Sequence, residues 1–217
     1  MPPSPKIIQL RELLAARGLA TAPRLPERFL AGWPALDLAA NEGLPKGDIS
    51  ELHCPRHGSA LAVAHLLHAA QRDRHFVALI DGVDGFDPAS VETAALARLL
   101  WVRCHNAAEA VQAADLVLRD GNLPLVLMNL RGCTDAVRVP SQTWYRLQRI
   151  VEQSGVALLV LTPRPMIPSA RVRVTLHGCF TLDDLERDRA ELVKTLSFET
   201  ARVQGARFDE PLLAEVG

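Results

Sequence analysis

The chain has 217 residues, 48% of them hydrophobic and 23% charged, with a formal net charge of −1 at pH 7. This length fits one domain with a sizeable core, and the composition is typical of an ordinary globular protein. A net charge so close to zero excludes a general positive field that would attract nucleic acid, so any DNA contact must come from a local patch.

The sequence also argues against secretion, membrane insertion and a cysteine-based metal site. The N-terminus lacks the continuous apolar region of a signal peptide, and the longest apolar runs, such as residues 156–161, are far too short to span a bilayer. The four cysteines lie far apart and form no C-x-x-C pair, which favours reduced thiols. We therefore expect a soluble, cytoplasmic protein that makes no membrane contact.

Residues 1–35 predict an arm that precedes the main domain. Within it, residues 6–17 predict a helix whose apolar face is formed by Ile7, Leu10, Leu13 and Leu14. An isolated helix this short is marginal in water, so its apolar face must dock on its own domain, on a second copy of the chain or on a partner protein. Residues 21–34 contain three prolines and predict an extended linker.

From residue 36 onward, predicted strands and helices alternate. The predicted strands are residues 49–52, 76–80, 100–103, 123–130 and 156–162, an edge strand at 171–176, and antiparallel strands near 192–198. The predicted helices are residues 59–72, 88–99, 106–119 and 141–153. Because the apolar runs do not alternate with polar residues, this order indicates an α/β domain at residues 36–217. Its sheet is expected to be mostly parallel, with helices on both faces and antiparallel C-terminal strands.

The stretch from Gly43 to Leu61, GLPKGDISELHCPRHGSAL, has the layout of a phosphate-binding loop. A strand leads into a loop with Gly58, and a helix follows, so that backbone N–H groups and the helix dipole are available to an anion. The working form of such a loop is G-x-x-x-x-G-K-[ST]. Here Ser59 stands where the lysine belongs and Ala60 where the Mg²⁺-binding hydroxyl belongs.

Three blocks of the chain resemble the bacterial RecA recombinase. They are Leu36-Asp37, the GLP-x-G turn with the strand after it (residues 43–52), and residues 80–88, which have the sequence IDGVDGFDP. The resemblance continues more weakly to about Leu176, and the ordered series of blocks is more specific than any one block. The length and the lost phosphate loop are most similar to the ImuA family, the RecA-related accessory proteins of bacterial error-prone polymerase cassettes. The resemblance implies a RecA-like core.

The chain departs from the RecA pattern at four separate positions. Ser59-Ala60 replaces Lys-Thr in the loop, and Val83 replaces the glutamate that activates the attacking water. Asn129 stands where an aspartate should orient Mg²⁺, and Pro163 replaces the glutamine that senses the γ-phosphate. Phosphoryl transfer depends on positioning and positive charge, and losing one such element typically costs about 10²–10³ in rate. We therefore expect a pseudo-ATPase with no catalytic residue, no ATP or Mg²⁺ cofactor, and a degenerate nucleotide site at Arg56, His57, Gly58, Ser59, Ala60, Val83 and Asn129.

The resemblance implies a non-catalytic scaffold in DNA damage tolerance, meaning error-prone translesion synthesis and SOS mutagenesis. Its implied partners are a Y-family-like polymerase relative and the error-prone polymerase of the cassette, with RecA, DNA and a second copy of the chain as further candidates. The apolar face of residues 6–17 matches the position of RecA's subunit-joining arm. The alternative is a divergent RecA/RadA-type DNA-dependent ATPase that uses substitute groups, with Arg56 and His57 as its remaining cations.

Two regions correspond to the DNA-binding loops of RecA-like folds. Their arginines, which follow predicted strands, are candidates for contact with DNA or a partner: Arg131, Arg138, Arg164, Arg171 and Arg173. The alternatives are a protein-binding rim and a plain DNA-binding module. Asp81, Asp84 and Asp87 also cluster after a strand, and their spacing favours a turn capped by Asp87 over a metal site. We predict no metal ligands.

Overall fold

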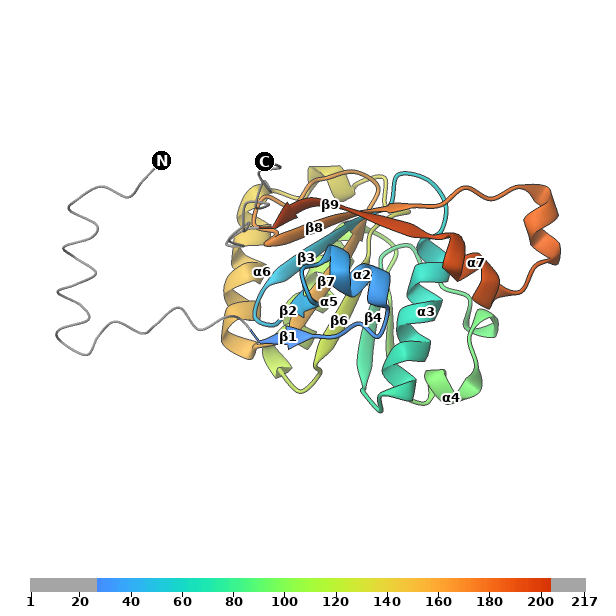
Figure 1. The fold of residues 1–217 in the computed structure, drawn as a ribbon. Helices are drawn as coiled ribbons and strands as arrows, with labels where there is room; N and C mark the ends of the chain where they lie inside the picture. The colour runs from blue at the N-terminus through green and yellow to red at the C-terminus, as the bar shows by residue number, and fades with distance from the viewer. Residues whose placement is uncertain (1–26, 204–217) are drawn as a thin grey trace, which may run out of the picture.

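The computed structural model describes residues 27–203, which form an α/β domain around a seven-stranded sheet (Figure 1). The strand order is β5-β4-β6-β7-β3-β8-β9, in which the first six strands are parallel and β9 is antiparallel to β8. The strands are β3 (Ile49–His53), β4 (Val77–Asp81), β5 (Leu99–Arg103), β6 (Leu125–Asn129), β7 (Ala157–Thr162), β8 (Val172–His177) and β9 (Ser197–Val203). The predicted mostly parallel sheet with an antiparallel C-terminal strand is confirmed, and the topology is compatible with a RecA-like core.

Helices cover both faces of the sheet, so consecutive residues of the central strands are buried on opposite sides. Leu79, Leu127 and Leu159 pack in one core with α2 and α3, whereas Ile80, Met128 and Val160 pack in a second core with α5 and α6. The helices are α2 (Pro34–Ala39), α3 (Ser59–Arg72), α4 (Thr93–Leu96), α5 (Ala107–Asp120), α6 (Ser141–Ser154) and α7 (Arg189–Thr195). Because six of the strands are parallel, their carboxyl ends all lie at one edge of the sheet.

The described part of the expected linker packs against the domain. β1 (Arg28–Phe29) pairs with β2 (Leu44–Pro45), and both Phe29 and Trp33 are buried. The ring of Trp33 meets Phe198 of β9 edge-on, with 4.6 Å between the ring centroids. Two buried aromatic rings hold this segment to the core despite its prolines. The division of the chain at residue 35 stays a prediction, and the expected helix over residues 6–17 lies outside the described residues.

Three predicted elements differ from the structure. The helix expected over residues 88–99 is reduced to a 3-10 turn (Pro88–Ser90) and the single turn of α4, because Val91 is extended and its side chain is buried. β8 was expected at the sheet edge, but it lies between β3 and β9. The alternation near residues 192–198 belongs partly to α7, and β9 begins only at Ser197.

We predict that Trp33→Ala lowers the free energy of unfolding by about 3–5 kcal/mol, because it removes a buried aromatic side chain from the core. Urea denaturation followed by circular dichroism measures the change. Leu38→Ala on α2 is the matched control, since Leu38 is 78% exposed, and it should change the value by no more than about 0.5 kcal/mol. Equal values for the two variants would mean that residues 27–35 are not part of the folded unit.

Candidate functional site

The degenerate loop lies at the carboxyl edge of the parallel sheet, where α/β proteins place their ligands. It occupies residues 54–58, between the end of β3 and the start of α3. Gly58, the N-cap residue of α3, has φ of +103°, a conformation that favours glycine. A Cβ atom on Gly58 would lie 2.7 Å from Cδ2 of Leu196. The backbone conformation and the packing of the C-terminal segment therefore explain this glycine without a bound phosphate.

Arg131 fastens the loop to the segment that follows β6. Its Nε donates to the Cys54 carbonyl oxygen at 2.7 Å, and its Nη2 donates to the carbonyl oxygen of Arg56. The N–H of Cys54 donates to the carbonyl oxygen of Thr162 at 2.8 Å. A phosphate loop turns N–H donors toward its anion. Here, two carbonyl oxygens of the loop face a guanidinium, and one N–H is already bonded within the protein.

Asn129, at the end of β6, supports the same arrangement. Its side-chain oxygen accepts a hydrogen bond from the N–H of Arg131 at 3.2 Å. Asn129 thereby fixes the turn that carries Arg131. We call this set of four residues the loop clasp: Cys54, Arg56, Asn129 and Arg131.

A cavity of about 380 Å³ lies beside the clasp. It brings together four residues of the predicted site, namely Ser59, Ala60, Val83 and Asn129. Much of the remaining wall is apolar, with side chains of Val63, Leu79 and Phe86. Arg131 is the one cation among the described residues that line the cavity, and its Nε and Nη2 are engaged in the clasp. The Asp87 carboxylate lies in the same wall and would repel a phosphate.

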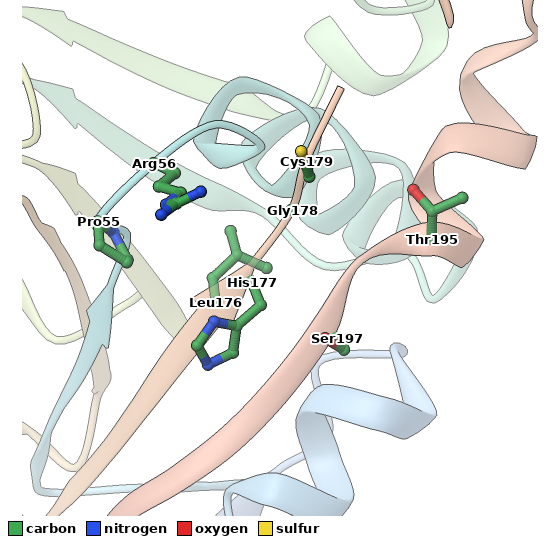
Figure 2. A pocket seen from close by; sticks show the side chains of 8 residues that line it. All are labelled: Pro55, Arg56, Leu176, His177, Gly178, Cys179, Thr195 and Ser197. Atoms are coloured by element: carbon green, nitrogen blue, oxygen red, sulfur yellow. The ribbon is translucent and has the colours of Figure 1, made fainter. Parts of the chain in front are cut away.

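The cations of the loop do not face this cavity. Arg56 instead lines a second hollow, of about 520 Å³, between the loop and the ends of β8 and β9 (Figure 2). In Figure 2 the side chains of Arg56 and His177 approach the same opening from the loop and from β8. His177 Nε2 lies 3.1 Å from Glu199 Oε2, so a carboxylate already accompanies the imidazole. His57 is exposed on the loop.

Asp81, at the end of β4, and Asp84 and Asp87 after it have separate local partners. Asp81 is buried, and its Oδ2 accepts from the N–H of Phe86 at 2.7 Å. Asp84 forms a bidentate pair with Arg103, which lowers the pKa of the Asp84 carboxyl. Asp87 accepts from the N–H of Ala89 at 3.0 Å and caps the following turn, as predicted. Across residues 27–203 no group of three or more His, Cys, Asp or Glu side chains is arranged to hold a metal ion.

Three of the five candidate DNA-contact arginines are engaged within the protein. Arg131 belongs to the clasp, and Arg171 pairs with Asp48 at 3.1 Å. Arg173 pairs with the buried Glu51 at 2.6 Å, and its side chain is 17% exposed. Arg138 and Arg164 are exposed. The three arginines that follow β7, namely Arg164, Arg171 and Arg173, therefore do not form one free basic patch.

Glu51 is the central residue that the sequence analysis missed. Its carboxylate, on β3, accepts from Thr162 Oγ1 at 3.0 Å and from the N–H of Met166 at 2.7 Å, in addition to Arg173. The network joins β3, β7 and β8 and fixes the start of the segment between β7 and β8. A lone carboxylate within the apolar run of β3 was the available signal, because a buried charge needs a partner.

Burial determines the protonation state of two cysteines near this edge, Cys54 and Cys133. It raises the pKa of the Cys54 thiol to about 12 and that of the Cys133 thiol to about 11, so both are neutral at physiological pH. Neutral thiols are poor nucleophiles and poor metal ligands. Among the described residues, no helix has the length and apolar character needed to cross a membrane.

No protein-family model matches the chain. The chain is similar to the DNA repair protein recA homolog 1, chloroplastic, of Arabidopsis thaliana, with 30% identity over 116 residues. The match covers 52% of this chain and 25% of the relative, so the chain spans about a quarter of the length of that curated protein. The similarity and the sheet topology together support a place for this chain in the RecA superfamily.

We predict that Arg173→Ala lowers the free energy of unfolding by about 3–5 kcal/mol, because it leaves the Glu51 carboxylate buried without its cation. Arg164→Ala removes an exposed arginine and should change the value by no more than about 0.5 kcal/mol. Chemical denaturation of both variants provides the measurement. If Arg173→Ala were as stable as Arg164→Ala, Arg173 would be free for a ligand and the structural role assigned to it would be wrong.

Proposed function

We propose that this chain is a non-catalytic RecA-like accessory protein, a pseudo-ATPase that acts through contacts with other macromolecules. The observation that carries the proposal is the loop clasp. In the loop that corresponds to the phosphate loop, two backbone carbonyl oxygens accept hydrogen bonds from Arg131. Asn129, which corresponds to the Mg²⁺ ligand, holds the same arginine in place.

The chemistry of the cavity supports the proposal. A nucleoside triphosphate brings about four negative charges, which a working site offsets with a lysine, a metal ion and converging N–H groups. Here Ser59 and Ala60 replace the lysine and the hydroxyl, and Val83 offers no base. Each lost element costs about 10²–10³ in rate, so their joint loss leaves no useful hydrolysis. ATP and Mg²⁺ are therefore not proposed as cofactors.

For the biological setting we propose DNA repair and, more narrowly, tolerance of DNA damage by error-prone translesion synthesis. The broader part is supported by the similarity to a plant DNA repair protein. The narrower part rests on the resemblance to the ImuA family. It implies a cytoplasmic protein whose partners are the Y-family-like polymerase relative and the error-prone polymerase of the cassette.

We predict that isothermal titration of the full chain with ATP and Mg²⁺ gives no saturable heat up to about 1 mM nucleotide, because the cavity has no free cation to offset the triphosphate. A Kd tighter than about 100 μM would contradict the proposal and favour the divergent ATPase. Hydrolysis is measured on the same preparation. Turnover above background that disappears in Ser59→Ala would contradict the proposal in the same way, whereas turnover that this variant leaves unchanged comes from a contaminant.

We further predict that deletion of residues 6–17 weakens a protein contact, because the apolar face formed by Ile7, Leu10, Leu13 and Leu14 needs a docking surface. Light scattering measures self-association, and pull-down with the two cassette polymerases measures partner binding. Matched substitution of Arg11 and Arg17 by serine leaves the apolar face intact and should preserve the contact. Unchanged assembly and unchanged polymerase binding after the deletion would rule out the proposed role of the arm.

A further inference from the structure

A furrow runs between α5 and α6, on the face of the sheet opposite α3. The two helices pack against each other, and two hollows of about 570 and 510 Å³ lie along their junction. Arg146 lines both hollows, and we call the two together the α5–α6 furrow. From Ala108 to Arg119 it follows about three helical turns, a length of about 16 Å.

The furrow carries an excess of positive charge. Four arginines line it, namely Arg119, Arg138, Arg146 and Arg149. The carboxylate of Asp115 pairs with Arg119 at 2.7 Å and with Arg146 at 3.5 Å, so it serves two of them. Arg138 and Arg149 are exposed, and within the described residues neither guanidinium makes a hydrogen bond or an ion pair. In a chain of net charge −1 these two arginines form a local site for an acidic partner.

The remaining carboxylates near the furrow are held by other groups. Asp135 accepts from the N–H of Ala107 at 3.1 Å, where it caps the start of α5. Glu109 is bonded to His105 and Asn106, and Glu152 on α6 accepts from Gln148 at 3.1 Å. None of these acidic groups neutralises Arg138 or Arg149.

The furrow also offers some apolar surface among its polar side chains. Val139 and Tyr145 line it, and Tyr145 is 53% exposed, whereas the lining side chains of Val111 and Ile150 are buried in the core. Outside the lining, Leu116 of α5 is 72% exposed, and Val137, next to Arg138 in the sequence, is 42% exposed. A phosphodiester backbone would use the arginines but not this apolar surface. Exposed arginine, tyrosine and leucine side chains around a groove between two helices are instead typical of a site that receives a third, amphipathic helix.

We propose that the α5–α6 furrow binds an acidic, amphipathic helical segment of a partner protein. Its apolar face lies on Val139 and Tyr145, and its carboxylates pair with Arg138 and Arg149. The furrow lies on the opposite face of the sheet from α3 and uses none of the residues of the loop clasp. This inference therefore does not depend on whether the nucleotide site is inactive.

The test is fluorescence anisotropy with a labelled amphipathic peptide of about 18 residues that carries leucine at i, i+3, i+4 and i+7 and glutamate elsewhere. The full-length protein should bind it saturably. Arg138→Glu with Arg149→Glu should raise the Kd at least about 10-fold, because both ion pairs become repulsive. The control variant, Arg74→Glu with Lys194→Glu, makes the same change in net charge on the face of the sheet covered by α3 and α7. It should raise the Kd of the peptide less than about 2-fold. Circular dichroism checks that each variant is folded.

Two further probes separate this proposal from its competitors. A peptide with serine in place of leucine keeps the charge and should bind at least about 10-fold more weakly, since it loses the apolar contact. A labelled oligothymidine should bind no better to the unmodified protein than to the Arg138→Glu, Arg149→Glu variant. The proposal is overturned if the two charge-reversed variants weaken peptide binding equally, if the serine peptide binds as well as the leucine peptide, or if only oligothymidine binding needs the furrow arginines.

Discussion

The contact between the Arg131 guanidinium and the carbonyl oxygens of Cys54 and Arg56 holds the loop after β3 in its conformation. In a phosphate loop the same backbone surrounds an anion, and the fold supplies the helix N-terminus that favours it. Here the loop surrounds a cation supplied by its own chain. The replacement of an anion by the Arg131 guanidinium is self-consistent, because Asn129 positions Arg131 and Ser59 stands where a competing lysine would be.

Elsewhere along the carboxyl edge, charged side chains are likewise paired with one another within the protein. Glu51 and Arg173 link β3 to β8 at a place where RecA-like folds hold a mobile DNA-binding segment, and Asp84 and Arg103 close the turn after β4. Groups that would recognise ligands in an active relative of this fold here bond to one another. Other exposed arginines lie away from this edge, along α5 and α6.

Much of the fold could be predicted from the sequence, because buried parallel strands consist mainly of unbroken apolar runs, such as residues 125–128 and 157–161. Tertiary packing decided the rest. Val91 turned a predicted helix into an extended segment by inserting its side chain into the core, and Trp33 packed the described end of the predicted linker against β9. In the candidate site, Ser59, Ala60, Val83 and Asn129 do meet around one cavity. The bonding of Arg131 and Glu51 depends on residues more than 70 positions apart, which periodicity and spacing cannot reveal.

Amide chemical shifts of residues 54–62, recorded by NMR on the full chain during a titration with ATP and Mg²⁺, test the central claim most directly. They report on the loop itself, independently of heat or turnover. If Arg131 occupies the loop as a substitute cation, these shifts stay unchanged up to about 1 mM nucleotide. Saturable shifts centred on Gly58 and Ser59 would show that the loop still binds phosphate, and would contradict the account.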